Sequence, residues 1–256
     1  MNIHPTAIVD SKAELADDVE VGAYSIIEAN VSIDAGTRIG AHVVVKGPSI
    51  IGKNNQFFSF GSIGEACQDK KYKNEPTKLI VGDNNVFREY VTLHRGTVQD
   101  RGETRIGDDN WVMAYVHIAH DCVVSNHTVL ANNATLAGHV TVGEGVILGG
   151  FTGVHQFCQI GAYSMAGMFS VITKDVPAFV MVSGHPASAH GLNVEGMRRK
   201  NYSAELIRDL KEAYKIVYRQ GLTLKEAIQQ LHSFSETEQL NLFIQSLEKS
   251  TRGIIR

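Results

Sequence analysis

Four of the eleven histidines, His117, His120, His139 and His155, fall in one short stretch of the chain. Imidazole titrates near neutral pH, so it can take a proton from a hydroxyl group, polarise a carbonyl, hold a phosphate or bind a metal. Asp121 follows His120 directly, and a carboxylate beside an imidazole can orient the ring and stabilise its cation. These residues predict acid–base chemistry or a metal site, provided that the fold brings them together.

A six-residue repeat predicts the fold that would do so. An aliphatic or aromatic residue recurs at every sixth position from Ile3 to Ile63, again from Val81 to Leu93, and without a break from Ile106 to Ile160. This period suits short parallel strands joined by tight turns, and it suits neither an amphipathic helix nor an alternating strand. We predict a β-solenoid in which each hexad forms one side and one corner. If three hexads make a coil, residues eighteen apart stack at about 4.8 Å, and the four histidines converge on one side.

Glycine often follows the inward aliphatic position of a hexad. The glycines at this position are Gly22, Gly40, Gly52, Gly64, Gly82, Gly107, Gly143 and Gly161. Because glycine takes positive φ angles without a steric penalty, we expect these residues to form the corners of the coils.

Two segments, at about 64–78 and 96–104, interrupt the repeat. Loops that leave a rigid scaffold often carry function, so we expect both insertions to contribute to a site. The first insertion holds an amide, a carboxylate and a cation close together. Its candidate substrate-binding residues are Gln68, Asp69 and Lys71.

The repeat disappears near Asn193, and helical signals replace it. Ser203 precedes an apolar helical face that ends at Gly221, and capping boxes are expected at the pairs Thr223–Glu226 and Ser235–Glu238. We predict a β-helix domain at residues 1–190, with the two insertions, and a C-terminal α-helical domain at residues 191–256. The helices could cover the open end of the solenoid, whose strand edges are otherwise unpaired.

Composition narrows the class of protein. The formal net charge of −3 leaves no basic excess for a phosphate backbone, which argues against nucleic-acid binding. The cysteines, Cys67, Cys122 and Cys158, lack the spacing of a disulfide framework or a thiolate zinc site. Neither a signal peptide nor a stretch of membrane-spanning length is apparent. We expect a cytoplasmic protein without a membrane span.

Several longer motifs resemble one known family. They are HRGT at 94–97, HIAHDC at 117–122, LANNATLAGHV at 130–140, VHQFC at 154–158, NVEG at 193–196 and STRGIIR at 250–256. Together they are similar to the UDP-N-acetylglucosamine 3-O-acyltransferases, a family of hexapeptide-repeat acyltransferases. These motifs are more specific than the repeat, which occurs in many transferases.

This resemblance implies a left-handed parallel β-helix with three sides and eighteen residues per coil, although the general rule for parallel crossovers favours the right hand. It implies transfer of a 3-hydroxyacyl chain from acyl carrier protein to the 3-hydroxyl of UDP-N-acetylglucosamine, the first step of lipid A biosynthesis. No cofactor and no covalent intermediate are expected. A homotrimer with active sites between subunits is also implied. The acidic carrier protein could meet the basic residues Arg198, Arg199, Lys200 and Arg219.

The resemblance also assigns roles to single residues. His120 matches the general base, Asp121 the group that orients its ring, and the backbone N–H of Gly138 the oxyanion donor. The expected substrate-binding residues are Asp69 and His117 for the sugar, His139 and Gln156 near the sugar and diphosphate, His155 in the same cleft, and Asn193, Glu195 and Arg199 for the uridine and phosphate. No metal ligand is expected among them.

Met168 stands where several members of the family have glycine, in the cleft that receives the acyl chain. A flexible four-atom side chain in place of a hydrogen atom shortens that cleft. We therefore expect a short donor of the 3-hydroxydecanoyl kind.

Two other interpretations stay open from the residues alone. Three histidines in a hexapeptide-repeat trimer resemble the zinc site of the γ-class carbonic anhydrases. The repeat by itself would also allow a structural β-solenoid without catalysis. The carboxylate directly after His120 argues against the first, and the histidine cluster with its two loops argues against the second.

Overall fold

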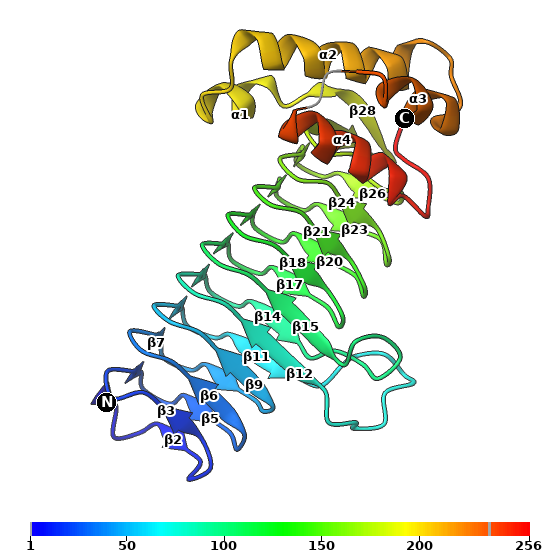
Figure 1. Ribbon diagram of the computed structural model, residues 1–256. Helices are drawn as coiled ribbons and strands as arrows, with labels where there is room; N and C mark the ends of the chain where they lie inside the picture. The colour runs from blue at the N-terminus through cyan, green and yellow to red at the C-terminus, as the bar shows by residue number, and fades with distance from the viewer. Residues whose placement is uncertain (1, 235–236) are drawn as a thin grey trace.

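Three sheets wind around a common axis through most of the chain. The computed structural model describes residues 2–234 and 237–256. Consecutive strands fall in different sheets and every third strand returns to the same sheet, so three strands make one coil of a three-sided column (Figure 1). The fold is the predicted left-handed parallel β-helix of hexapeptide repeats, with helices after it.

The strands are short and follow the hexads. Sheet A contains, in spatial order, β1 (Asn2–Ile3), β4 (Glu20–Val21), β7 (Arg38–Ile39), β10 (Gln56–Phe57), β13 (Val86–Phe87), β16 (Trp111–Val112), β19 (Val129–Leu130), β22 (Ile147–Leu148), β25 (Met165–Ala166), β27 (Val180–Gly184) and β28 (Ala187–Leu192). Sheet B contains β2 (Ile8–Val9), β5 (Ile26–Ile27), β8 (Val44–Val45), β11 (Ser62–Glu65), β14 (Thr92–His94), β17 (His117–Ile118), β20 (Thr135–Leu136), β23 (Gly153–Val154) and β26 (Val171–Ile172). Sheet C contains β3 (Glu14–Leu15), β6 (Val31–Ile33), β9 (Ser49–Ile51), β12 (Lys78–Val81), β15 (Glu103–Ile106), β18 (Val123–Val124), β21 (Thr141–Val142) and β24 (Gln159–Ile160). All pairings in them are parallel except that of β27 with β28.

The inward position of each hexad fills the column. Ile118 pairs in register with Leu136, and Leu136 with Val154, so successive coils stack aliphatic side chain on aliphatic side chain. From Val21 onward the predicted inward residues are buried, which confirms the six-residue pattern. Ile3 is 37% exposed because it lies in the first coil, where no coil precedes it.

The glycines after the inward positions do not form the corners in the way the sequence predicts. Among them, all within the described residues, only Gly64 has a positive φ, of 73°. The left-handed residue of a corner comes two positions later, as in Tyr24 and His42, with φ of 59° and 58°. The glycines are needed for space instead, because a Cβ on Gly22 would lie 2.7 Å from the carbonyl carbon of Gly40 in the next coil.

Aromatic side chains stack along the corner between sheets A and B. Tyr24, His42, Phe60, Tyr90 and Tyr115 follow one another at ring-centroid distances of 4.8 to 5.1 Å. Offset stacking of neighbouring rings adds to the stability of coil packing at an exposed edge.

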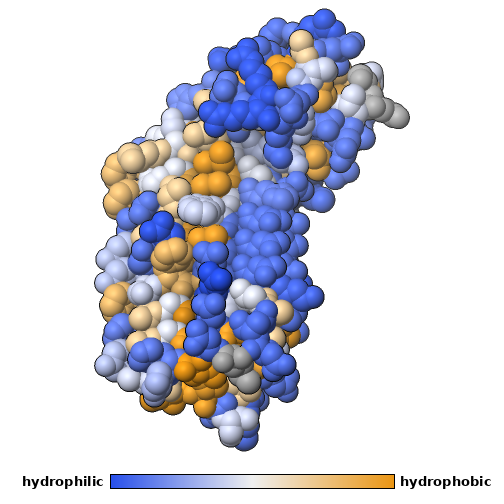
Figure 2. Space-filling model, turned by 90° about the vertical axis from the view of Figure 1, so that its left-hand side faces the viewer, coloured by the Kyte–Doolittle hydropathy of each residue, from blue (hydrophilic) through white to orange (hydrophobic). Residues whose placement is uncertain are grey.

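The outward side chains of sheet A form an apolar row in the later coils. This sheet A ladder consists of residues paired in register, namely Val86, Trp111, Val129, Ile147, Met165 and Met181. Figure 2 faces the side of the column that carries sheet A and shows apolar side chains gathered in a band along it. Trp111 is 43% exposed and Met181 36% exposed, so the described chain leaves this row partly uncovered.

Two loops leave the column at neighbouring coils. Residues 66–77 connect β11 to β12, and residues 95–102 connect β14 to β15. Both loops project from the same flank of the column, beside β12 and β15 (Figure 1). The backbone N–H of Arg95 donates to the carbonyl of Glu65 at 3.0 Å, which joins the start of one loop to the start of the other.

Helices follow the last coil and cover its end (Figure 1). They are α1 (Val194–Arg199), α2 (Ala204–Arg219), α3 (Leu224–Leu231) and α4 (Glu238–Glu248). Ser203 caps α2, and Thr223 with Glu226 forms the predicted capping box of α3. The side chain of Thr237 caps α4, whereas Ser235, the predicted capping residue, lies outside the described residues. Among the described helices, none has the length and apolar character that crossing a bilayer requires.

A row of buried asparagines at the corner between sheets C and A gives a test of the coil packing. Asn55 Oδ1 accepts from the backbone N–H and the side-chain amide of Asn85, and Asn85 Oδ1 accepts in the same way from Asn110, at 2.9 to 3.0 Å. We expect Asn85→Ala to lower the free energy of unfolding by about 1–3 kcal/mol, because buried donors and acceptors lose their partners. Urea denaturation measures this. Gln56→Ala, an exposed amide one coil away, is the control and should change stability by less than about 0.5 kcal/mol.

Candidate active site

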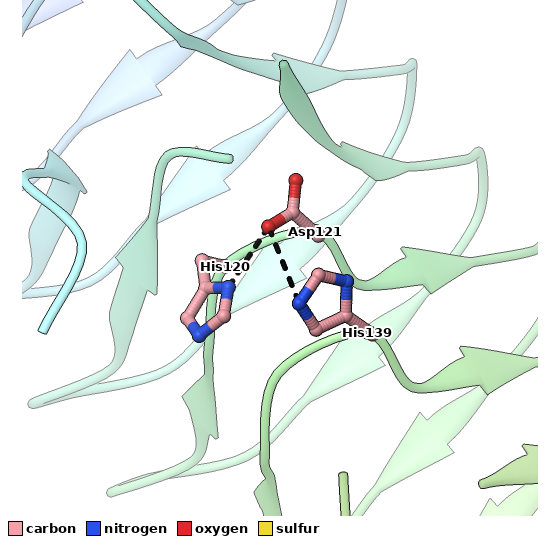
Figure 3. Close-up of side chains that lie close together, drawn as sticks. All are labelled: His120, Asp121 and His139. Atoms are coloured by element: carbon pink, nitrogen blue, oxygen red, sulfur yellow. Dashed lines mark hydrogen bonds and ion pairs between the residues drawn. The ribbon is translucent and has the colours of Figure 1, made fainter. Parts of the chain in front are cut away.

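The centre of the candidate site is a hydrogen bond between neighbouring residues. His120 and Asp121 follow β17, at the corner between sheets B and C. Asp121 takes a left-handed backbone conformation with φ of 59°, and Nδ1 of His120 lies 2.8 Å from its Oδ2 (Figure 3). Because a carboxylate only accepts, Nδ1 carries the proton. Among the described residues, Nε2 of His120 has no hydrogen-bond partner, so it is available as a base.

Asp121 is fully buried and firmly held. Thr97, in the loop of residues 95–102, donates its backbone N–H to Oδ1 at 2.9 Å and its hydroxyl to Oδ2 at 2.6 Å. The backbone N–H of Asp121 donates to the hydroxyl of Thr104 at 2.8 Å. Burial opposes ionisation of this carboxyl group, but the bonds from His120 and Thr97 outweigh it and hold its pKa below the usual value. At neutral pH the group is therefore a carboxylate that fixes the His120 ring.

His139 comes from the next coil and joins this pair. Its ring centroid lies 5.0 Å from that of His120, edge to face, and its Nε2 lies 3.8 Å from Oδ2 of Asp121 (Figure 3). Asp100 reaches its Nδ1 at 3.0 Å, and the ring of Phe157 stacks on it at 4.5 Å. Three of the predicted site residues, His120, Asp121 and His139, are thus brought together.

Gly138 lies against the ring of His120. A Cβ on this residue would lie 2.5 Å from Cε1 and 2.6 Å from Nε2 of His120, so any larger residue would displace the ring. Within residues 2–234 and 237–256 its backbone N–H has no acceptor. A backbone N–H without an acceptor, on a residue that lies against an imidazole, suits a developing oxyanion.

His117 lies on sheet B close to the central pair. Its Nδ1 lies 2.7 Å from the hydroxyl of Thr92, and its ring meets that of His94 edge to face at 4.9 Å. Burial, together with the neighbouring charges of His94 and His120, lowers the pKa of His117 to about 4. Burial likewise lowers the pKa of His94. Both rings are therefore neutral at physiological pH, so neither adds a positive charge beside His120.

Other predicted residues stand apart from this cluster. His155 is exposed, and its Nδ1 faces the carbonyl of Gln156 at 3.2 Å. Gln68, Asp69 and Lys71 are exposed in the loop of residues 66–77, where the carboxylate of Asp69 accepts from the backbone N–H of Lys71 at 2.9 Å. In the described part of the chain, no hydrogen bond or ion pair joins any of these five residues to the central cluster.

Asn193, Glu195 and Arg199 lie at another corner, between sheets C and A. They line a pocket of about 520 Å³ together with outward residues of sheet A, including Ile147 and Met165. Asn193 caps α1 by accepting from the N–H of Gly196 at 3.0 Å. Glu195 and Arg199 are exposed and pair with each other at 3.5 Å. A single chain therefore divides the predicted site residues into two groups on different corners.

Two other chemistries can be compared with this geometry. Ligand atoms of His120, Asp121 and His139 lie within 4.8 Å of one another, which would allow a metal, but both oxygens of Asp121 already accept from Thr97. The zinc arrangement considered from the sequence needs a third histidine, and among the described residues the group of possible ligands contains only His120, Asp121 and His139. Burial raises the pKa of the Cys122 thiol to about 12, so this cysteine is not a thiolate nucleophile.

Three residues of the site were missed by the sequence analysis as functional candidates. Thr97 and Thr104 hold Asp121, and Asp100 holds His139. All three lie in or beside the insertion at 96–104, and the break in the repeat was the signal that could have found them. Which of its polar side chains turn back onto the column depends on the path of the loop.

Comparison with known proteins places this geometry in a family. Residues 175–255 match the model described as UDP N-acetylglucosamine O-acyltransferase, domain 2, and residues 103–138 match the bacterial transferase hexapeptide model. The chain is 58% identical over 258 residues to the acyl-[acyl-carrier-protein]–UDP-N-acetylglucosamine O-acyltransferase of Thiobacillus denitrificans, covering 99% of both chains. It is 56% identical over 255 residues to the protein of that name from Stutzerimonas stutzeri, again covering 99% of both.

Solved structures agree over the same length. The structure of LpxA from Acinetobacter baumannii superposes with a TM-score of 0.96 at 53% identity and covers 99% of both chains. The UDP-N-acetylglucosamine acyltransferase of Francisella novicida superposes with a TM-score of 0.97 at 37% identity, covering 99% of this chain and 94% of that one. With this identity extending through the β-helix, both loops and the helices, the chain belongs to the family of UDP-N-acetylglucosamine O-acyltransferases.

Proposed function

We propose that this chain transfers a 3-hydroxyacyl group from acyl carrier protein to the 3-hydroxyl of UDP-N-acetylglucosamine, as the first step of lipid A biosynthesis. One observation carries the proposal beyond family membership. Nδ1 of His120 is bound to a buried, ionised carboxylate, which leaves Nε2 free close to Gly138, whose backbone N–H has no acceptor among the described residues. This arrangement supports a base and an oxyanion donor that act on one reacting carbonyl.

The reaction uses these groups in order. Nε2 of His120 takes the proton of the sugar hydroxyl as the oxygen attacks the thioester carbonyl. The carbonyl oxygen becomes an oxyanion that accepts from the N–H of Gly138, while Asp121 stabilises the imidazolium. The carbonyl re-forms as the C–S bond breaks, and the imidazolium returns the proton to the departing thiolate of the carrier. No covalent acyl-enzyme is needed, which suits a buried and protonated Cys122.

Side chains around His120 and Gly138 are proposed to bind the sugar nucleotide. His139 lies beside the base and serves the sugar and diphosphate with Gln156, and His117 and Asp69 serve the sugar. His155 and the polar residues Gln68 and Lys71 border the same cleft, while Asn193, Glu195 and Arg199 serve the uridine and phosphate. Arginine suits the last role because its planar fork matches phosphate oxygens.

The active site is proposed to lie between subunits of a homotrimer. His120 and Arg199 stand at different corners of the column, so one substrate that uses both is best served by two copies of the chain. The sheet A ladder supports this arrangement because a partly exposed apolar row needs a partner surface (Figure 2). The same row, which ends at the pocket beside α1, offers an apolar path for the acyl chain.

The positive charge of the surface near α1 supports acyl carrier protein as the partner that brings the donor. Arg198, Arg199 and Lys200 are exposed on and after α1 and are placed to attract the acidic carrier protein.

The three cysteines are free and buried, which fits a reducing compartment, and we propose a cytoplasmic location.

Replacing the base gives the direct test of the reaction. We expect His120→Ala to lower kcat for acyl transfer by roughly 10²- to 10⁴-fold, because the hydroxyl then loses its proton acceptor. Steady-state assays with acyl carrier protein thioesters measure this, and sedimentation should show that the variant remains a trimer. His232→Ala, which removes an exposed imidazole paired with Glu248 at the helical end, is the control and should retain activity. Transfer by His120→Ala at the normal rate would remove His120 as the base.

Replacing Asp121 tests both orientation and charge. We expect Asp121→Asn to lower kcat by on the order of 10²- to 10⁴-fold, since the amide no longer fixes the Nδ1 proton of His120. The folded pKa of Asp121 is depressed, so its stabilisation is present above the ordinary carboxyl pKa of about 4 and is lost as pH falls through the folded value. The stability gap between wild type and variant, measured by urea unfolding, should therefore shrink in acid. A gap that does not change with pH would contradict this assignment.

Met168 should set the length of the acyl donor. Its side chain is 64% exposed, and its Cε lies 3.7 Å from the position a Cβ would take on Gly150 in the preceding coil. We expect wild type to prefer 3-hydroxydecanoyl donors and Met168→Gly to accept 3-hydroxymyristoyl donors, because removal of the side chain lengthens the cleft. Assays over a donor series measure this. Met168→Leu keeps the bulk and is the matched control, and a wild-type preference for the long donor would contradict the idea.

A further inference from the structure

The loop of residues 95–102 touches the histidine cluster at two points. Thr97 is buried and donates two hydrogen bonds to Asp121, the partner of the base. Three residues later, Asp100 reaches Nδ1 of His139 at 3.0 Å. The ring of His139 is 15% exposed and the side chain of Asp100 is 37% exposed, so this contact lies at the mouth of the cluster. The loop therefore supports both imidazoles, each through a different side chain.

Three neighbours define the position of the His139 ring. Phe157 stacks on its face at 4.5 Å with an interplanar angle of 12°, and Asp121 lies 3.8 Å from Nε2. Stacking would also permit a half-turn of the ring about the Cβ–Cγ bond, which exchanges the positions of the ring nitrogens and carbons, and a distance of 3.8 Å is too long for a hydrogen bond. Asp100 supplies the one short polar contact to this ring among the described residues.

The chemistry of that contact decides which nitrogen faces the cluster. A carboxylate has no proton to give, so Nδ1 of His139 must donate to Asp100. Nε2 is then the nitrogen directed toward Asp121 and the space beside His120. An imidazole fixed in this way presents an Nε2 that can accept from a sugar hydroxyl without first having to be ordered, which favours binding.

We propose that Asp100 is a positioning residue that acts through His139: by holding Nδ1, it presents Nε2 to the sugar nucleotide. This inference rests on the proposed function, in which His139 contacts that substrate. A purely structural role is the alternative, since Asp100 also lies 3.9 Å from Arg101 at the tip of the loop. The two roles differ in whether the effect of Asp100 passes through His139.

A double-mutant cycle in the full chain separates these roles. We expect Asp100→Ala to raise KM for UDP-N-acetylglucosamine about tenfold, because the ring of His139 loses one hydrogen bond to a charged group. KM for the acyl carrier protein thioester should stay unchanged. Asp100→Asn keeps an acceptor oxygen without the charge and should show a smaller rise. In a His139→Ala background, Asp100→Ala should have no further effect. Glu248→Ala is the matched control, because it removes an exposed carboxylate 2.9 Å from His232, far along the chain from the site.

A second readout does not depend on activity. Diethyl pyrocarbonate modifies unprotonated imidazole nitrogens, and mass spectrometry locates the modified residue. We expect Asp100→Ala to speed the modification of His139 about tenfold, since one ring nitrogen loses its partner, and to leave His232 unchanged. If wild type transferred no acyl group, the proposed function would fail, and this footprint would still decide whether Asp100 positions His139.

Two results would overturn the inference. One is an unchanged footprint at His139 in Asp100→Ala. The other is a rise in KM that persists in full in the His139→Ala background, because Asp100 would then act by another route.

Discussion

The stacking of coils in register is the constraint on which the rest of the structure depends. Each inward side chain lies on the equivalent side chain of the next coil, as Ile118 lies on Leu136, so the spacing between coils is that of neighbouring strands. Close spacing leaves no room for a Cβ at positions such as Gly22, where the neighbouring backbone would be 2.7 Å away. The same spacing brings side chains from different coils into contact at the corners. His120 and His139 meet in this way, with ring centroids 5.0 Å apart.

A rigid column positions side chains well, and the interruption of the repeat supplies hydrogen bonds to the Asp121 carboxylate from Thr97. The inward positions are apolar, so a carboxylate buried at a corner must find its hydrogen bonds elsewhere. The carboxylate of Asp121 finds them in Thr97, within the loop that leaves the column, while Thr104, just after that loop, accepts from the backbone N–H of Asp121. The carboxylate therefore stays ionised in a buried place, and its charge keeps the neighbouring imidazole in one orientation. Column and loop together position the proposed base, His120, and neither would do so alone.

The geometry of one chain also supports the proposed assembly of several chains. The proposed base, His120, stands between sheets B and C, and the pocket beside α1 stands between sheets C and A. A three-sided column cannot turn two of its corners toward the same point. It can offer one corner to one neighbouring chain and another corner to a second chain. A neighbouring chain would also cover the partly exposed apolar row on sheet A (Figure 2).

The sequence by itself determined the β-solenoid, because one residue in six must be apolar to fill a column of this kind, and that pattern is visible without coordinates. The left hand and the three sides were expected only from the resemblance to a known family. The sequence also determined the pair His120 and Asp121, since adjacent residues cannot be far apart. It did not determine the reason for the glycines after the inward positions, which depends on the distance between coils rather than on φ. Nor could it assign Thr97 or Asp100, because the path of an irregular loop has no period. The separation of Arg199 from His120 was likewise decided by tertiary structure, since it depends on which corner of the column each segment reaches.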